Sequence, residues 1–400
     1  MSDGLRVLIV ADDLTGAMDT AGPFAQRGLK TSVVPQPLAC DPASLATSQV
    51  ISLDTGSRHL PPAEAAKRVA QCVSRFGTQS FDIVFKKIDS TLRGNVVAET
   101  LGLMRACGRD AALVAPAFPA QGRTVREGMV YVNGVPLPET GFARDALSPA
   151  LRRPLTEVFG EAVGTTKVGI WSPTVKKGAV GRSIVIADGE SDADLRAVLE
   201  TAKPQFGRML LVGSAGLGNA LARSLEAGKA TRPELNVSGP VVFVVGSRAV
   251  QSHEQVERLR ALAGTVVIEA PNGMVPEQVQ TGAALQIVIL AVPGAARARA
   301  DADKVADDLA AGALRIVRST RSQGLVATGG DTAIALLLRS GCIALEVLGD
   351  LMPGLPYARL NLDGKPLWLV TKAGGFGGRD TLYEIALRLR GGPHSVETSR

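Results

Sequence analysis

The alternation of short apolar runs with helix-period segments constrains the fold of this chain more than any other feature. In the first half these runs are RVLIVA, TSVVP, QVISL, DIVFKKI, AALVAP, SIVIA and MLLVG, and in the second half VVFVVG, TVVIE, QIVILAV, GLVAT, CIALEVL and LWLVT. Sheets that are buried on both faces require such nearly continuous apolar strands. We therefore predict an α/β fold in which largely parallel sheets are flanked by helices.

The length of 400 residues favours two or three domains. Residues 222–240 mix small, charged and turn-forming side chains without a sustained period, and we place the boundary there. The resulting prediction is an N-terminal domain at 1–228, a linker at 229–239, a C-terminal domain at 240–391 and a disordered tail at 392–400. The Gly- and Pro-rich residues 117–149 predict a binding loop or a hairpin excursion within the first domain.

Composition argues against several classes of protein. The formal charge of +6 comes without a basic run that is interleaved with aromatics, and aromatics make up only 4% of the chain, so nucleic acid is not an expected partner. No apolar run approaches the ~20 residues of a membrane helix, and acids interrupt the first run too early for a signal peptide. We expect a cytoplasmic protein without a membrane partner. Four scattered cysteines and three histidines do not predict a zinc site, and any metal would be bound by oxygen.

Polar side chains follow three consecutive strands of the first half. These residues are Asp12, Asp13, Thr15, Arg58, Lys87, Asp89, Arg93 and Asn95. Ligands of open parallel sheets bind beyond the carboxyl ends of the strands, and this mixture of groups suits a small polyhydroxy acid. Each residue alone has a plainer interpretation, because Asp and Thr commonly cap helices and many arginines lie on the surface. Lys86 is the weaker lysine, since strand alternation points it away from Lys87.

Glycine-rich turns follow the strands of the second half. Ser247 comes after one strand, GGDTA after a second and KAGGFGG after a third. Glycine lets the backbone approach a ligand, and the free N–H groups at a helix start bind phosphate. Two such turns favour a phosphate-bearing ligand, although either could be a simple tight turn. The sequence has no GxxxxGK[ST], no GxGxxG after the first strand of either half, and no GxSxG, so neither a P-loop, nor a dinucleotide fold, nor a nucleophile elbow is predicted.

The motifs taken together resemble those of a known family. ADDLTGAMDTA, DTGSR, FKKIDSTLRGN, AFPAQGR, YVNG, TGGDTA and KAGGFG resemble, in this order, the motifs of the four-carbon acid sugar kinase family, from about Leu5 to about Leu389. The resemblance implies a kinase that uses ATP and Mg²⁺, with an acid-sugar-binding N-terminal domain, a nucleotide-binding C-terminal domain and the active site in the cleft between them. It also implies phosphorylation of the 4-hydroxyl of threonate, erythronate or a 3-oxo-tetronate.

The resemblance assigns residues to both halves of the site. The acid-sugar side falls on Asp12, Asp13, Thr15, Gly16, Arg58, Lys87, Asp89, Arg93 and Asn95, and the nucleotide side on Ser247, Gly329, Gly330, Asp331, Thr332, Gly374 and Gly375. Arg58, Lys87 and Arg93 would hold the substrate carboxylate or the transferring phosphoryl group. Asp13 and Asp89 lead as the catalytic base, and Asp331 is a rival. The second domain is short between Ser247 and Gly329, so the family's adenine pocket is not carried over.

Two other functions remain open at this point. An NAD(P)-dependent hydroxy-acid dehydrogenase would share the fold class and the substrate class, and the missing GxGxxG is the feature against it. A non-catalytic sugar-acid-binding protein would need only one of the two ligand-type regions. The order of residues does not decide which four-carbon acid or stereoisomer is bound. A homodimer is the first assembly to expect, because closed two-fold assemblies dominate soluble oligomers.

Overall fold

The computed structural model describes residues 5–144, 149–171, 183–229, 231, 233, 235, 237–277, 285–293 and 301–390. The chain divides into two compact units, residues 1–230 and 231–400. The tail expected at 392–400 lies outside the described residues, as do four residues of the linker expected at 229–239. No helix in the described ranges is both long and apolar enough to cross a membrane. All four cysteines are free and buried.

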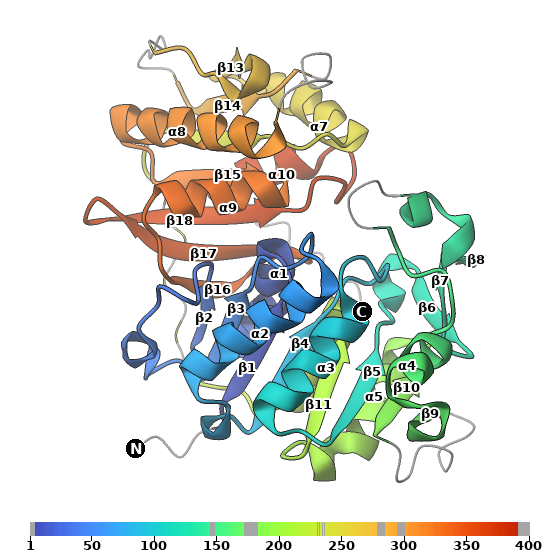
Figure 1. The fold of residues 1–400 in the computed structure, drawn as a ribbon. Coiled ribbons are helices and arrows are strands. Elements are labelled where there is room, and N and C mark those ends of the chain that lie inside the picture. Colours follow the sequence, from blue (N-terminus) through green and yellow to red (C-terminus); the bar gives the residue numbers. More distant parts are fainter. Residues whose placement is uncertain are drawn as a thin grey trace. The chain divides into compact units, whose positions relative to one another are not determined.

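The first unit is built around a parallel sheet with the strand order β2-β3-β1-β4-β11-β5-β10-β9 (Figure 1). The strands are β1 Val7–Ala11, β2 Thr31–Val34, β3 Val50–Asp54, β4 Ile83–Lys87, β5 Ala111–Ala115, β9 Val168–Trp171, β10 Ile184–Ala187 and β11 Met209–Gly213. The helices are α1 Leu14–Gln26, α2 Pro62–Phe76, α3 Val96–Cys107, α4 Leu155–Val163, α5 Asp192–Ala202 and α6 Ala215–Ser224. The prediction of a largely parallel α/β fold is confirmed.

The direction of the crossovers decides where this sheet can bind a ligand. The chain leaves β1 through α1 toward β2, and it leaves β4 through α3 in the opposite direction toward β5. Right-handed crossovers in opposite directions place their helices on opposite faces. Accordingly, α1 packs with α6, and α2 packs with α3. The loops after β1 and β4 therefore diverge, and this switch point is where open α/β sheets bind ligands.

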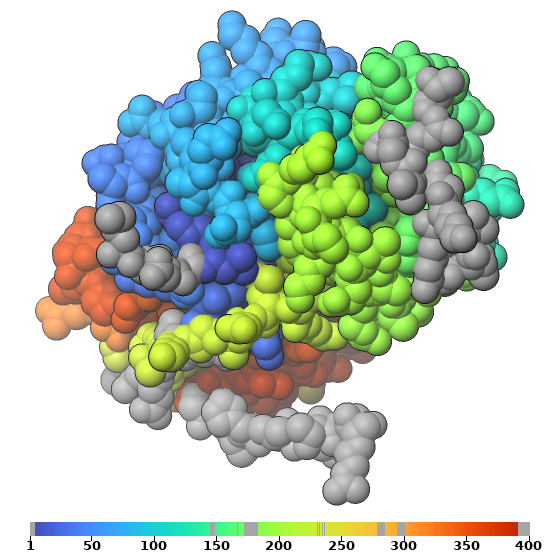
Figure 2. All heavy atoms as spheres, turned by 90° about the horizontal axis from the view of Figure 1, so that it is seen from below, coloured from blue at the N-terminus to red at the C-terminus, as the bar shows by residue number. Residues whose placement is uncertain are grey.

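Later parts of the chain return to complete the first unit. Strand β11 lies between β4 and β5, so VGSAGLG ends a central strand and begins α6. Segments that are distant in sequence, coloured blue, cyan, green and lime, form one continuous face in Figure 2. The excursion expected at 117–149 contains a small antiparallel sheet made of β6 Arg123–Arg126, β7 Met129–Val132 and β8 Val135–Pro136.

The second unit contains a mixed sheet with the strand order β13-β14-β12-β15-β18-β17-β16. The strands are β12 Val241–Val245, β13 Thr265–Glu269, β14 Ile287–Ala291, β15 Gly324–Thr328, β16 Leu345–Met352, β17 Leu355–Leu362 and β18 Lys365–Lys372, and the helices are α7 Val250–Arg260, α8 Ala302–Thr320, α9 Gly330–Arg339 and α10 Thr381–Leu389. The strands from β13 to β18 in this order pair in parallel, whereas β18, β17 and β16 pair antiparallel.

Strands β9 and β17 were not predicted. VGIW in β9 has only four residues, and LPYARLNL in β17 is interrupted by Pro356, Arg359 and Asn361. The second unit has its own switch point between β12 and β15. The chain leaves β12 toward β13 on one side, and it leaves β15 toward the β18 side of the sheet. This topology places Ser247 and the Gly329 turn at the mouth of the same crevice.

A buried ion pair lies in the core of the first unit. Lys86 on β4 and Glu99 on α3 are each 1% exposed, and Lys86 Nζ lies 2.7 Å from Glu99 Oε2. Lys86 Nζ also donates to the carbonyl of Lys87 at 2.8 Å, and Ser57 Oγ donates to Glu99 Oε1 at 2.8 Å. Full burial of both charges requires such hydrogen bonds, because an unpaired charge in the interior is very costly.

We predict that breaking this pair destabilises the first unit strongly. Lys86→Met and Glu99→Gln should each lower the free energy of unfolding by about 3–5 kcal/mol, since each leaves a buried polar group without its partner. The double change Lys86→Met with Glu99→Leu should cost less than the sum of the single changes. Urea unfolding followed by circular dichroism measures these differences.

The matched control is the exposed helical pair Lys304–Asp308, whose lysine side chain is 72% exposed. Lys304→Met should change the free energy of unfolding by less than about 1 kcal/mol. If Lys86→Met proved as mild as Lys304→Met, the buried pair would not be a stabilising element of this fold.

Candidate functional site

Three side chains from the first two strand ends form a closed cluster. Arg58, in the loop after β3, donates from Nε and Nη2 to both oxygens of Asp12, each at 2.9 Å, and from Nη1 to Asp13 at 2.5 Å. Burial alone would raise the pKa of Asp12, but the charges of Arg58 and Lys86 outweigh it and lower the pKa. The structure thus brings Asp12, Asp13 and Arg58 together, with the charge of Arg58 largely neutralised by the two carboxylates.

The start of α1 approaches Lys87 very closely. Asp13 caps α1 by accepting from the Gly16 amide at 2.8 Å, and Thr15 lies half-buried in the first helical turn. A β-carbon at Gly16 would lie 2.7 Å from Asp13 Oδ1 and 3.0 Å from Lys87 Nζ, so a larger residue there would displace the carboxylate that caps α1. Lys87 is 5% exposed and forms no ion pair within the described residues, which leaves its ammonium group available to a ligand.

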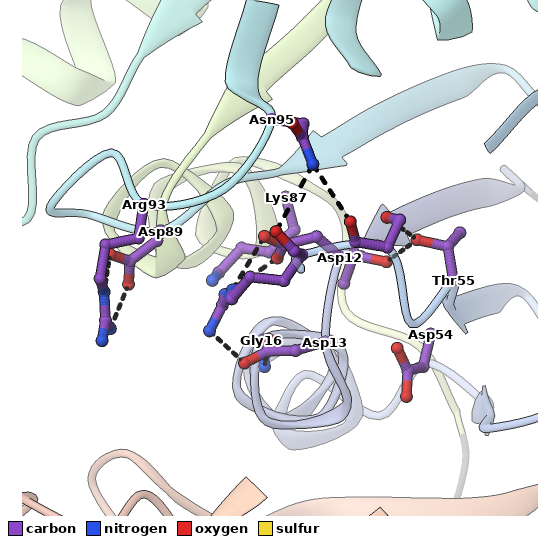
Figure 3. Close-up of polar contacts among 12 residues, drawn as sticks. Asp12, Asp13, Gly16, Asp54, Thr55, Lys87, Asp89, Arg93 and Asn95 are labelled. Atoms are coloured by element: carbon purple, nitrogen blue, oxygen red, sulfur yellow. Dashed lines mark hydrogen bonds and ion pairs between the residues drawn. The ribbon is translucent and has the colours of Figure 1, made fainter. Parts of the chain in front are cut away.

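The third strand end carries a second, separate ion pair. Arg93 donates from Nε and Nη2 to the two oxygens of Asp89, at 2.8 Å and 3.1 Å, and Thr91 also donates to Asp89. Burial would raise the pKa of Asp89, but the hydrogen bonds and charge of Arg93 hold it well below its usual range. Asp89 and Arg93 lie to one side of Asp12 and Asp13, and Asp54 and Thr55 lie to the other (Figure 3).

The hairpin excursion adds a cation beside this pair. Phe142, in the short helix Gly141–Arg144, lies between two guanidinium groups, with Arg93 Cζ 5.8 Å and Arg123 Cζ 5.9 Å from its ring centre. Burial and the charge of Arg93 lower the pKa of Arg123, and Asp89 partly offsets them. Two arginines therefore face one carboxylate, and the surplus positive charge suits an anionic ligand.

Asn95 has a clear structural task. Its Nδ2 donates to the carbonyls of Ser57 at 3.2 Å and Leu60 at 2.8 Å, and it thereby fixes the loop that carries Arg58 (Figure 3). Gly94 adopts a φ of +85°, and a β-carbon there would lie 2.9 Å from Asp12 Oδ2. The Asn95 amide nitrogen is therefore engaged by the protein, and its oxygen is the part that remains for a hydroxyl group.

Asp54, at the end of β3, is a buried acid beside this cluster. Its Oδ1 accepts from the Gly56 amide at 2.9 Å, which forms the Asx turn typical of such loops. Burial, with the nearby carboxylates of Asp13 and Asp12, raises the pKa of Asp54 to about 7. The net charge of the site therefore changes near neutral pH.

The candidate nucleotide residues meet in the second unit. A β-carbon at Gly374 would lie 2.1 Å from Ser247 Oγ, and one at Gly329 would lie 3.5 Å from the Ser247 backbone. Thr332 is buried under Gly246, while Gly330 and Asp331 occupy the first turn of α9. The Asp331 side chain is exposed and takes part in no hydrogen bond or ion pair within the described residues. Three strand ends therefore converge on one glycine-lined region.

A buried lysine, Lys372 at the end of β18, contacts the glycine-rich loop that follows it, although the sequence did not predict it as a site residue. Lys372 Nζ donates to the carbonyls of Ala373, Gly374 and Phe376, at 3.0, 3.0 and 3.1 Å. Arg123 and Glu99 were also missed as members of a site. Arg123 and Glu99 depend on contacts with distant segments. Lys372 contacts carbonyls within four residues of itself, so its position directly before a glycine-rich turn was a usable signal.

Metal ligands are scarce in both units. Within the described ranges, no group of three or more His, Cys, Asp or Glu residues is arranged to hold a metal ion. A divalent cation would therefore be bound mainly by the phosphates of a bound nucleotide, with one carboxylate of the protein, as is usual for Mg²⁺. Asp331, exposed beside the Gly329 turn, is a carboxylate of this kind.

Comparison with known proteins agrees with the two-part layout. Residues 7–221 match the family described as a sugar-binding N-terminal domain, and residues 242–382 match a nucleotide-binding C-terminal domain. A D-threonate kinase from Bordetella bronchiseptica is 34% identical, with 97% of this chain and 98% of that protein covered. A 3-oxo-tetronate kinase from Methylobacterium radiotolerans is 30% identical, with 93% and 96% covered.

Solved structures share the fold along nearly the whole chain. A Salmonella typhimurium protein has a TM-score of 0.77 at 21% identity, with 96% of this chain and 98% of that chain covered. A Bordetella bronchiseptica domain of unknown function, solved as a domain-swapped dimer with bound citrate, has a TM-score of 0.51 at 32% identity, with 97% and 98% covered. The family models and the relatives together show that this chain is a kinase of the four-carbon acid sugar kinase family.

Proposed function

We propose that this kinase transfers the γ-phosphoryl group of ATP to the 4-hydroxyl of a four-carbon sugar acid in sugar-acid catabolism. The observation that carries the proposal is the convergence of charged and hydroxyl-binding side chains at the switch point of the first unit. Relatives named for D-threonate and 3-oxo-tetronate support the substrate class. D-threonate is the first acid to test, followed by D-erythronate and the 3-oxo-tetronates.

The acid-sugar side supplies two kinds of contact. Lys87 and the Arg93–Arg123 pair offer positive charge to a carboxylate or to the transferring phosphoryl group. Asp12, Asp13 and the Asn95 oxygen offer acceptors for sugar hydroxyls. Arg58 holds Asp12 and Asp13 in place, so its main contribution is to orient these acceptors rather than to bind the anion itself.

The nucleotide side supplies backbone groups. The amides of Gly330, Gly374 and Gly375, together with Ser247 and Thr332, would bind a phosphate chain near a helix start. Mg²⁺ bound to the phosphates would neutralise the charge that develops during transfer. Phosphoryl transfer depends mainly on such positioning and charge neutralisation.

During transfer, the substrate 4-oxygen forms a bond to the γ-phosphorus, and the bond from that phosphorus to the ADP oxygen breaks. The 4-hydroxyl loses its proton to a base late in the reaction. Asp89 is the weakest candidate, because Arg93 lowers its pKa. Both oxygens of Asp13 already accept hydrogen bonds from the protein, whereas Asp331 is exposed. We therefore place Asp331 first as the base.

Replacing each acid by Asn should separate these roles. Asp331→Asn should lower kcat by about 10²–10⁴-fold, the usual contribution of a general base. Asp13→Asn and Asp89→Asn should act mainly on the KM for the sugar acid, because they alter positions that hold the substrate. A coupled ADP-release assay measures kcat and KM, and phosphorus NMR identifies the 4-phosphate. If all three variants keep a near-normal kcat, the assignment of the base is wrong.

Arg123 should recognise the carboxylate of the substrate. Arg123→Met should raise the KM for the sugar acid by about tenfold or more, because a hydrogen bond to a charged group is worth about 1.5–3 kcal/mol. The inhibition constant of threitol, which has the same four carbons without a carboxylate, should stay unchanged. The control is Arg126→Met on the same strand, where the arginine is exposed and paired with Glu190. Equal losses for the acid and for threitol would contradict this role.

The pKa of Asp54 predicts a pH dependence. Its carboxyl is neutral below a pH of about 7 and charged above it, so the KM for the sugar acid should rise as the pH passes through that value. The unfolded chain releases this proton near pH 4, whereas the folded protein keeps it up to about pH 7. The free energy of unfolding should therefore fall as the pH rises between these two values, because the unfolded state binds fewer protons there.

Asp54→Asn should weaken both trends, because the amide keeps the hydrogen bond to Gly56 without a charge. KM measured between pH 6 and 8.5, and urea unfolding at pH 5 and 8, test the two readouts. Asp192→Asn, at an exposed helix start in the same unit, serves as the control. Profiles of Asp54→Asn that matched the unmodified protein would exclude Asp54 as their cause.

We further propose that the protein forms a homodimer in solution. The relative at 32% identity that was solved as a domain-swapped dimer supports this assembly. Closed two-fold assemblies are also the commonest soluble oligomers. Sedimentation velocity at micromolar concentration would show either a dimer or a monomer of 41.5 kDa.

A further inference from the structure

The loop Ala373–Gly378 has an unusual distribution of hydrogen bonds. Its carbonyls face donors inside the second unit, because Lys372 Nζ binds those of Ala373, Gly374 and Phe376. Two buried side chains of α7 donate to the same carbonyls: Ser252 Oγ donates to that of Gly374 at 2.6 Å, and Gln255 Nε2 donates to that of Phe376 at 3.0 Å. The carbonyl side of this loop is therefore fixed from two elements.

The amide side of the loop is open. Gly375 is exposed and Gly374 is half-buried, and in the part of the chain that the structure describes neither amide donates to a protein acceptor. In a trans peptide unit the carbonyl and the N–H of the next residue point in opposite directions, so an inward carbonyl leaves the next N–H pointing outward. Successive free N–H groups of this kind form a concave site that binds anions. A β-carbon at Gly374 would lie 2.1 Å from Ser247 Oγ, so the loop passes directly over Ser247.

Lys372 also connects this loop to the other glycine-rich turn. Its backbone carbonyl accepts from the Gly329 amide at 2.9 Å, and its Cα pairs with Thr328 in the parallel ladder of β15 and β18. One residue thus holds both turns, Gly329 through the main chain and the Ala373–Gly378 loop through the side chain.

The chemistry of the lysine suits this task. Its side chain is 2% exposed, and an ammonium group offers three donors, which matches the three carbonyls that it contacts. Burial lowers the pKa of Lys372 to about 8, so near neutral pH the group still carries all three protons. Its positive charge also lies directly beneath the open amides, where it favours an anion.

We propose that Lys372 is a positioning residue of the nucleotide site, which holds the Ala373–Gly378 loop so that the Gly374 and Gly375 amides bind phosphate oxygens of the nucleotide. The proposal rests on the proposed function, and it assigns the phosphate subsite to a specific loop. It predicts an effect on nucleotide binding and little effect on the acid sugar.

The test compares Lys372→Met with Lys372→Arg, which keeps the charge and donors, and with Lys365→Met at the exposed start of the same strand. Lys372→Met should raise the KM for ATP at least tenfold, while kcat and the KM for the sugar acid change by less than about threefold. Lys372→Arg should recover part of the loss, and Lys365→Met should behave as the unmodified protein. A KM for ATP within twofold of normal in Lys372→Met would overturn the proposal.

Direct binding separates this proposal from the proposed function. Calorimetric titration with ADP and with inorganic tripolyphosphate, without sugar acid, should show the same tenfold weakening in Lys372→Met. If the unmodified protein binds ADP but phosphorylates no four-carbon acid, the substrate assignment fails and the role of Lys372 is still tested by this titration.

A second variant covers the case in which Lys372→Met does not fold, which a thermal melt would reveal. Ser252→Ala removes a second donor to the Gly374 carbonyl, which comes from α7. It should weaken binding of both tripolyphosphate and ADP by a few-fold. Unchanged binding of both ligands in this variant would overturn the idea that inward-held carbonyls orient the amides.

Discussion

The buried contact between Lys86 and Glu99 is the interaction on which the acid-sugar site depends. Glu99 accepts from Ser57, and the backbone amides of Ser57 and Arg58 donate to the carbonyl of Asp12. The loop after β3 is therefore attached to the helix α3 on one side and to the end of β1 on the other. Both charges of the pair are fully buried, so a displacement of Glu99 or Lys86 would leave a buried charge without its partner. The free-energy cost of such an unpaired charge restrains the loop after β3, which is bound to Glu99 through Ser57. The position of the Arg58 guanidinium between Asp12 and Asp13 follows from that fixed loop.

In the function that we propose, the two units bind anionic ligands in different ways. The first unit uses side chains, with carboxylates and guanidinium groups packed against each other so that most of their charge is balanced before a ligand arrives. Lys87 and the Arg93–Arg123 pair carry what remains. The second unit uses the backbone, because glycines remove the side chains that would separate its amides from a ligand, and a buried lysine sets the direction of the peptide units. Hydroxyl groups need individually placed acceptors, whereas a phosphate chain is matched by a row of N–H groups, so each solution fits its ligand.

Much of the architecture could be predicted from local sequence, and much of the site chemistry could not. Apolar runs and the residues after them identified the strands and their polar ends, because both are properties of a few neighbouring residues. Strands β9 and β17 were not predicted, because the first has only four residues and the second is interrupted by Pro356, Arg359 and Asn361. Alternation correctly separated Lys86 from Lys87, yet nothing near Lys86 shows that its partner is Glu99 on the next helix. Likewise, the engagement of Asn95 with the Ser57 loop and the placement of Arg123 against Phe142 depend on distant contacts. The side chain of Lys372 contacts the loop that directly follows it, but the sequence alone does not show that the carbonyls of this loop face the lysine. The roles assigned to individual site residues stay predictions.

The close approaches at Gly16 and Gly94 limit how this site could be redesigned. A single added methyl group would lie 2.7 Å from the Asp13 carboxylate at Gly16 and 2.9 Å from the Asp12 carboxylate at Gly94, so either substitution would displace a member of the charged cluster. The Asp12–Arg58–Asp13 cluster is similarly constrained, because Arg58 donates hydrogen bonds to both carboxylates and replacing any one of the three residues would remove at least one of these bonds. An engineer who wishes to change the preferred acid therefore has few adjustable positions, and the most promising are Arg93 and Arg123. Substrate preference in this protein should thus be easier to alter through the hairpin excursion than through the strands that form its sheet.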